Sequence, residues 1–177
     1  MDKIKIEQIL QSCEFNDYKW LNPQEDIVLA HWVRFKCMFG CSGYGKNGGC
    51  PPAVPSVEEC HKMIREYKHA VILHFSVNPQ AEDGREVTTA EYLALEREIF
   101  FAGYYKTFVL PHNQCRTCEK CVSEDNRTKC IDKANSRPGP DAMGIDIFAT
   151  ARNAGYAPKV AKTRDDITDR FSFVLID

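Results

Sequence analysis

Nine cysteines in 177 residues constrain this chain more than any other feature of its sequence. An odd number cannot all pair as disulfides within one chain, and a chain of this length buries enough apolar surface to fold without covalent cross-links. The N-terminal residues include Asp2 and Glu7 and lack the apolar stretch of a secretory signal. We therefore expect a cytoplasmic protein with reduced cysteines, and clustered reduced thiols predict a metal site.

The composition excludes several other classes of protein. Hydrophobic residues make up 44% of the chain and charged residues 27%, which is typical of a globular fold and excludes a disordered chain. The net charge is only -2, and no basic stripe is interleaved with aromatic residues, so no nucleic-acid partner is expected. The apolar runs are too short to cross a bilayer, so no membrane partner is expected either. No repeat or linker divides the chain, which predicts one metal-binding domain over residues 1–177.

Apolar periodicity predicts short helices and strands in alternation. An N-terminal helix is indicated by one apolar stripe, formed by Ile6, Ile9, Leu10 and Cys13. Capping boxes predict the starts of two more helices, at Ser56 with Glu59 and at Thr88 with Glu91. A broken helix is expected over 141–154, and strands are expected over 27–35, 70–77, 104–110 and 171–176. The predicted fold class is α/β or α+β, with a mixed sheet of about four strands and cysteine-bearing loops that follow strands.

The most specific cysteine pattern is a C-x2-C-x2-C run formed by Cys115, Cys118 and Cys121, with Cys130 further on. Three thiolates spaced in this way in a tight loop can converge on a cubane and leave backbone amides to hydrogen-bond the sulfides. Structural zinc sites usually take two ligands from each of two separate knuckles. The spacing therefore favours a [4Fe-4S] cluster with Cys130 as the fourth ligand, and zinc or unligated thiols are the alternatives.

A second set of cysteines lies in a Gly- and Pro-rich loop and consists of Cys37, Cys41 and Cys50. The predicted strand over 27–35 would deliver the chain to Cys37, and the glycines would allow the loop to return Cys50 to the same place. Three thiolates would hold a cluster with one iron open to a non-cysteine ligand, to Cys60 or to a substrate. The alternative is that these small side chains only pack in a turn.

Other candidate ligands are expected to be structural. Cys13 and Cys60 lie on apolar helical stripes, where a free cysteine usually packs as a small core residue. His31, His69 and His74 lie in or beside predicted strands and are interpreted in the same way. His112 lies three residues before Cys115, so it can complete a metal site or donate a hydrogen bond to a thiolate.

These motifs occur in an order that resembles a known family. The order is Cys37-x3-Cys41, then Tyr-Gly-Lys-Asn, then Cys50-Pro-Pro, a Ser-x-x-Glu-Cys helix, the C-x2-C-x2-C run and a lone cysteine. The chain from about Cys37 to Gly155 is similar to a prokaryotic family of small cysteine-rich cytoplasmic proteins described as predicted metal-binding. The resemblance implies metal binding and no particular reaction.

Three functions are consistent with these patterns. The first is electron transfer by one or two [4Fe-4S] clusters to a redox partner protein. It is favoured because no acid–base pair or activated nucleophile is apparent in the sequence. The second is an iron–sulfur enzyme with an open iron at Cys37, Cys41 and Cys50, which needs a pocket there with Lys46 and Asn47 facing in. The third is a zinc-stabilised interaction module.

Overall fold

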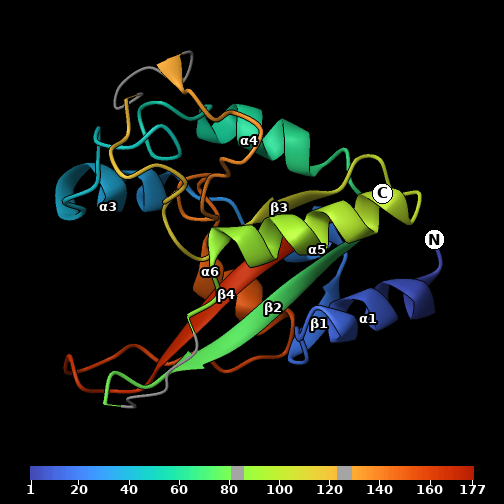
Figure 1. Ribbon diagram of the computed structural model, residues 1–177. Coiled ribbons are helices and arrows are strands. Elements are labelled where there is room, and N and C mark those ends of the chain that lie inside the picture. The colour runs from blue at the N-terminus through green and yellow to red at the C-terminus, as the bar shows by residue number, and fades with distance from the viewer. Residues whose placement is uncertain (81–85, 123–128) are drawn as a thin grey trace.

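The computed structural model describes residues 1–80, 86–122 and 129–177, and one antiparallel sheet organises them (Figure 1). The order of the strands in the sheet is β1-β2-β4-β3. The strands are β1 (Tyr18–Leu21), β2 (Ala70–Val77), β3 (Phe108–Leu110) and β4 (Thr168–Leu175). The prediction for 70–77 is confirmed to the residue, whereas the strand expected over 104–110 covers only its last three positions. All three strand pairings are antiparallel, where a mixed sheet was expected.

Two helices cover one face of the sheet. These are α1 (Lys3–Ser12) and α5 (Thr89–Phe101), and Figure 1 shows α5 lying across the strands. Ile6 and Leu10 of α1 pack in one apolar cluster with Val71 and Leu73 of β2. Both predicted capping boxes are present, and the cap at Thr88 starts α5.

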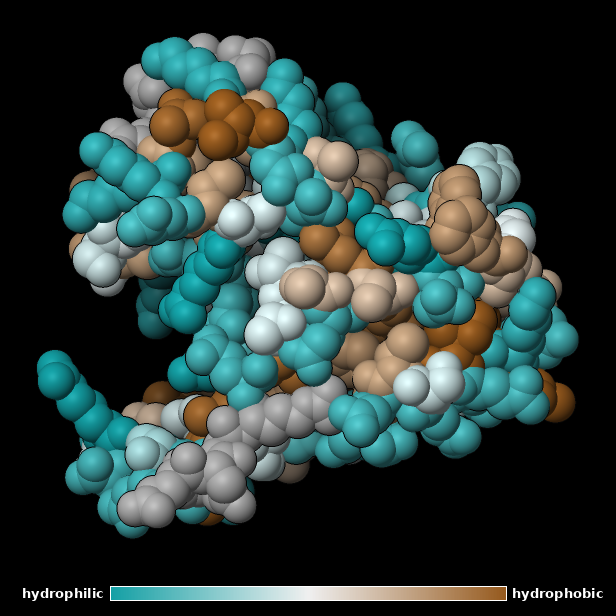
Figure 2. All heavy atoms as spheres, viewed as in Figure 1, coloured by the Kyte–Doolittle hydropathy of each residue, from teal (hydrophilic) through white to brown (hydrophobic). Residues whose placement is uncertain are grey.

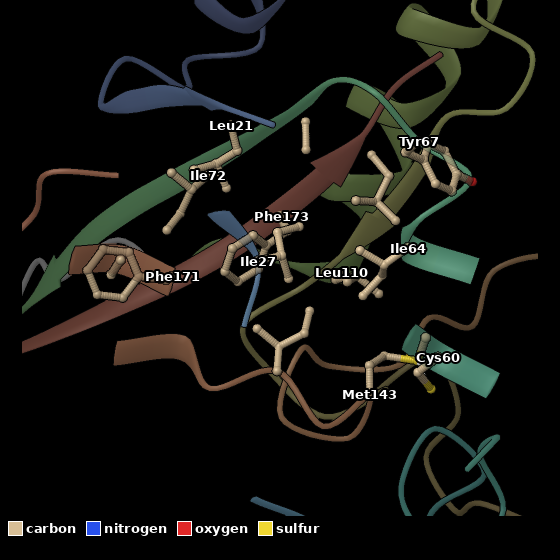
Figure 3. Packing of buried hydrophobic residues seen from close by; sticks show 14 residues of the cluster. Leu21, Ile27, Cys60, Ile64, Tyr67, Ile72, Leu110, Met143, Phe171 and Phe173 are labelled. Atoms are coloured by element: carbon tan, nitrogen blue, oxygen red, sulfur yellow. Dashed lines mark hydrogen bonds between the residues drawn. The ribbon is translucent and has the colours of Figure 1, made fainter. Parts of the chain in front are cut away.

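The opposite face of the sheet is covered by α4 (Val57–Ile64), α6 (Ile147–Asn153) and the segments around them. Figure 3 shows Ile72 and Phe173 of the sheet on the same side as Ile64 of α4. Because successive side chains of a strand point to opposite faces, β2 and β4 supply both apolar clusters. This is an α+β arrangement, and it confirms the predicted fold class.

The strand predicted over 27–35 is wrong. After α2 (Pro23–Asp26) the chain forms a single bridge at Leu29, and α3 then runs from His31 to Gly40. Cys37 therefore lies in the last turn of a helix and does not follow a strand. The segment is rich in residues with high strand propensity, but no strand of the described chain lies beside it. Its backbone N–H and C=O groups are therefore satisfied within a helix.

Candidate metal centre

Four cysteines meet in one small cavity, which we call the four-thiol hollow. The cysteines that line it are Cys115, Cys118, Cys121 and Cys130. Desolvation raises the pKa of the Cys118 thiol, and negative charge on Cys130 and on Asp132 raises it further. The C-x2-C-x2-C run and the later cysteine are thus brought together, as their spacing predicts.

The Gly-rich loop closes one side of the four-thiol hollow. The backbone N–H of Gly48 donates a hydrogen bond of 3.3 Å to Sγ of Cys121. A Cβ atom on Gly49 would lie 3.0 Å from Cβ of Cys115, so the two loops approach too closely for a side chain at this position. An amide donor aimed at a sulfur atom is the contact that stabilises a thiolate metal ligand.

Asn47 joins the same two loops through its side chain. Its Nδ2 atom donates a hydrogen bond of 2.6 Å to the carbonyl of Cys115, and its Oδ1 atom accepts one of 2.8 Å from the N–H of Gly49. Asn47 was expected to face a pocket beside Cys37, but it lines the four-thiol hollow instead. Lys46 lines neither thiol-bearing cavity.

The second set of thiols borders a larger cavity of about 350 Å³, which we call the thiol cavity. Its cysteines are Cys37, Cys41 and Cys50. Burial raises the pKa of Cys37 to about 11 and that of Cys50 to about 12, and negative charge on Asp141 and Cys41 adds to both shifts. Metal binding at these thiols must therefore displace protons at neutral pH.

Polar groups reach toward the sulfur of Cys41 from two loops. The N–H of Gly43 lies 3.4 Å from this sulfur, and the side-chain amide of Gln114 lies 3.8 Å from it. A Cβ atom on Gly43 would lie 2.3 Å from Nε2 of Gln114, so the Gln114 side chain would have to move to accommodate it. In the described residues, no three His, Cys, Asp or Glu side chains gather tightly enough to hold a single metal ion.

Arg34 fixes α3 against the rest of the site. Its Nη2 atom donates hydrogen bonds to the carbonyls of Pro55, at 3.0 Å, and Ala142, at 2.8 Å. Its Nε atom is buried and has no hydrogen-bond partner within the described residues. The positive charge of Arg34 counteracts, in part, the rise in the pKa of Cys37 that burial and Asp141 cause. An uncompensated guanidinium nitrogen beside thiols fits a site that carries negative charge when thiolates are bound to metal.

His112 lies at the thiol cavity and not at the four-thiol hollow, although Cys115 is only three residues away. Its Nδ1 atom lies 2.8 Å from the hydroxyl of Tyr92. Several other residues of this cavity were missed by the sequence reasoning, among them Asp141 and Arg170. No local motif marks them, because they come from distant parts of the chain.

The two remaining cysteines lie where their apolar stripes predict. Cys60 is 1% exposed and contacts Sδ of Met143 at 3.6 Å, and Figure 3 shows these two side chains together. Burial raises the pKa of Cys60 to about 11. Cys13 packs against the apolar cluster that contains α1. Both positions fit core cysteines.

Two groups of thiols on adjoining loops of an α+β fold are the features of a cysteine-based metal-binding protein. This chain belongs to the family of predicted metal-binding proteins called DUF2284, whose family model matches residues 19–176. The resemblance of its motifs to such a family is thus confirmed. No curated protein and no solved structure matches the chain. Across the described residues, every helix is too short or too polar to span a membrane.

Proposed function

We propose that this protein binds one or two [4Fe-4S] clusters and transfers single electrons in the cytoplasm. The observation that carries the proposal is the four-thiol hollow, in which the N–H of Gly48 donates to Sγ of Cys121. Cubane clusters need several converging thiolates and amide donors to sulfur, and the four thiols that line this cavity and the N–H of Gly48 support such a site. When bound, such a cluster supplies a one-electron couple.

The second set of thiols supports an additional centre close to the first. Burial is the main reason for the raised pKa of Cys50, and negative charge on Asp141, Cys41, Cys37 and Cys115 raises it further. The contribution of Cys115 means that the thiol cavity and the four-thiol hollow are near neighbours. Short separations between centres favour electron transfer, so this placement suits a carrier with two clusters.

The surface of α3 supports a redox partner protein. Four large apolar side chains on this helix are exposed to solvent, namely Trp32, Phe35, Met38 and Phe39. Phe35 and Phe39 stack with ring centroids 6.0 Å apart. A contiguous exposed apolar surface of this kind marks an interaction site, and this one lies on the helix that carries Cys37. A partner docked there would be close to the proposed second cluster.

Metal analysis of protein purified without oxygen tests the proposal. We expect iron and acid-labile sulfide in about equal amounts, at four or eight atoms of iron per chain. A paramagnetic resonance signal should appear after reduction with dithionite. Zinc at about one ion per chain, with negligible iron and sulfide, would refute the proposal and support a zinc-stabilised interaction module instead.

The second candidate function is an iron–sulfur enzyme in which one iron at Cys37, Cys41 and Cys50 has no cysteine ligand. The observation that favours it is the thiol cavity, whose volume of about 350 Å³ can hold a small molecule beside these thiols. Cyanide added to the reduced protein distinguishes the two functions. A changed resonance signal from one of two clusters indicates an open iron, and unchanged signals support a simple carrier.

A further inference from the structure

We infer that the thiol cavity binds a small molecule that carries a carboxylate or another oxyanion, through Arg116, Arg170 and Nε2–H of His112. All three side chains line the cavity. This inference goes beyond electron transfer, and it depends on side chains that belong to neither set of cysteines. It therefore holds whether or not iron is the bound metal.

A chain of buried hydroxyl groups determines which nitrogen of His112 carries the proton. The Ser172 hydroxyl is fully buried, accepts the backbone N–H of His112 at 3.1 Å and lies 2.6 Å from the hydroxyl of Tyr92. The hydroxyl of Tyr92 lies 2.8 Å from Nδ1 of His112. Every group is satisfied when Ser172 donates to Tyr92 and Tyr92 donates to Nδ1.

The opposite arrangement would leave a buried donor unused. If Nδ1–H donated to Tyr92 and Tyr92 donated to Ser172, the proton of the Ser172 hydroxyl would have no acceptor among the described residues. Leaving a buried hydroxyl donor unpaired costs about 1–3 kcal/mol. The imidazole of His112 therefore presents an N–H group at Nε2, the ring nitrogen not bound to Tyr92.

Two guanidinium groups stand beside this donor. Arg170 lies two residues before Ser172 on β4, so both side chains leave the same face of the sheet. Burial lowers the pKa of His112 and the positive charges of Arg170 and Arg116 lower it further, whereas the negative charge of Glu86 raises it, so all three charged groups lie around the imidazole. Arg116 pairs with Glu86 at 3.3 Å, and among the described residues no carboxylate pairs with Arg170. A planar guanidinium presents two parallel N–H groups, which match the two oxygens of a carboxylate.

Glu86 is paired with Arg116, and Asp141 lies on another part of the cavity wall. Asp141 contributes negative charge to Cys37 and Cys50, so it stands on the side of the thiols. The space-filling view in Figure 2 shows the surface hollowed between the part that bears α3 and the outer ends of β2 and β4. Arg170 lies near that end of β4, whereas Cys37 belongs to α3. An anionic ligand would therefore place its oxygens at the arginines and its remainder toward the thiols.

Calorimetric titration with malonate tests this inference on anaerobically purified protein at constant ionic strength. Malonate is a small dicarboxylate, and malonamide has nearly the same shape without the charge. We expect saturable binding of malonate at one site per chain, competition by sulfate and at least tenfold weaker binding of malonamide. Equal affinity for the two compounds, or no binding of malonate, would overturn the inference.

Matched variants locate the binding site. Arg170→Gln and Arg116→Gln should each weaken malonate binding at least tenfold, because each removes one guanidinium. Arg164→Gln, which alters an exposed arginine outside the cavity lining, should bind malonate as the natural protein does. If both cavity variants bind malonate like Arg164→Gln, malonate is bound elsewhere and the inference is wrong. Iron content, measured on the same samples, tests the proposed function separately.

The protonation of His112 is tested directly by nitrogen chemical shifts of the imidazole. We expect Nε2 to carry the proton in the natural protein at neutral pH. In Tyr92→Phe the donor to Nδ1 is lost, and the shifts should become those of mixed tautomers. A proton on Nδ1 in the natural protein would refute the assignment of His112 as a donor to the ligand.

Discussion

The side-chain amide of Asn47 donates a hydrogen bond of 2.6 Å to the backbone carbonyl of Cys115, and this bond joins two loops that lie 68 residues apart in the sequence. The same side chain accepts the N–H of Gly49, which keeps the Gly-rich loop in its turn. One residue therefore sets the position of the loop that closes the four-thiol hollow.

Replacing Asn47 should loosen metal binding at the four-thiol hollow. Asn47→Ala removes two hydrogen bonds of about 1 kcal/mol each, so we expect the bound metal to be released to a chelator roughly tenfold faster. Asn16→Ala, which alters an exposed asparagine whose side chain makes no hydrogen bond to the other described residues, is the control. Equal release rates for the two variants would contradict the role of Asn47.

Cysteine variants separate ligands from core residues. Cys118→Ala removes a thiol from the four-thiol hollow, so most of the metal at that site should be lost, because binding and local folding are coupled. Cys60→Ala removes one sulfur atom from the packed core, so it should retain the metal and lose about 1 kcal/mol of unfolding free energy. Cys13→Ala should behave in the same way. The metal content per chain of each variant distinguishes ligands from core residues. If Cys60→Ala loses as much metal as Cys118→Ala, Cys60 is a ligand.

An ion pair that anchors the segment after Cys130 should contribute strongly to stability. Arg137 makes a two-pronged contact with the carboxylate of Glu96, and their side chains are only 14% and 13% exposed. Arg137→Met leaves a buried charge on Glu96, which should lower the free energy of unfolding by about 3 kcal/mol. Denaturant unfolding measures the loss, with Arg152→Met as the exposed control.

A second substitution shows how that loss arises. Adding Glu96→Gln to Arg137→Met removes the unpaired charge, so the double variant should be more stable than Arg137→Met alone. If the double variant is less stable than the single variant, the loss does not come from a buried unpaired carboxylate.

The stability of the sheet should depend on pH through His74. This imidazole lies between two carboxylates, with Nδ1 2.6 Å from Asp17 and Nε2 2.9 Å from Asp169. Burial lowers the pKa of His74, but the hydrogen bonds to the two carboxylates raise it overall above the ordinary value of 6.5. For Asp17, burial raises the pKa, and the hydrogen bonds from His74 and Tyr156 bring it below 3.8.

These shifts define the direction of the pH dependence. Because the folded pKa of His74 is raised, its stabilising contribution is complete below about pH 6.5 and is lost as the pH rises through the folded pKa. The contribution of Asp17 is present above about pH 3.8 and is lost as the pH falls through its lowered pKa. His74→Gln should lower the free energy of unfolding by about 1–2 kcal/mol at pH 6 and by less at pH 9. His31→Gln is the exposed control, and a loss for His74→Gln that grows with pH would refute the charged contact.

Local patterns predicted the parts of the molecule that depend on local interactions. Strand β2 and the start of α5 at Thr88 were predicted because the residues that determine them are close together in the sequence. The C-x2-C-x2-C run was recognised for the same reason. The segment that forms α3 was interpreted wrongly, because its local preference for a strand has no partner strand among residues 1–80, 86–122 and 129–177. Val33 and Phe35 alternate with Arg34 and Lys36, which resembles a half-buried strand, but Phe35 is exposed on the helix.

The charged wall of the thiol cavity could not be found in the same way. Arg170 and Asp141 reach the cavity only because β4 and the turn before α6 fold back beside Cys37. Their positions depend on tertiary structure, and no spacing in the sequence encodes it. The grouping of the thiols could be predicted because cysteines that bind metal follow close spacing rules, whereas the side chains that would contact a small molecule follow none.

The position of β4 in the sheet has a consequence for how the protein is made. β4 lies between β2 and β3, so those two strands have no strand that hydrogen-bonds to both of them until residues 168–175 have been made. All nine cysteines are translated before that point, since the last of them is Cys130. The sheet that positions both sets of thiols is therefore completed only after every cysteine has been made.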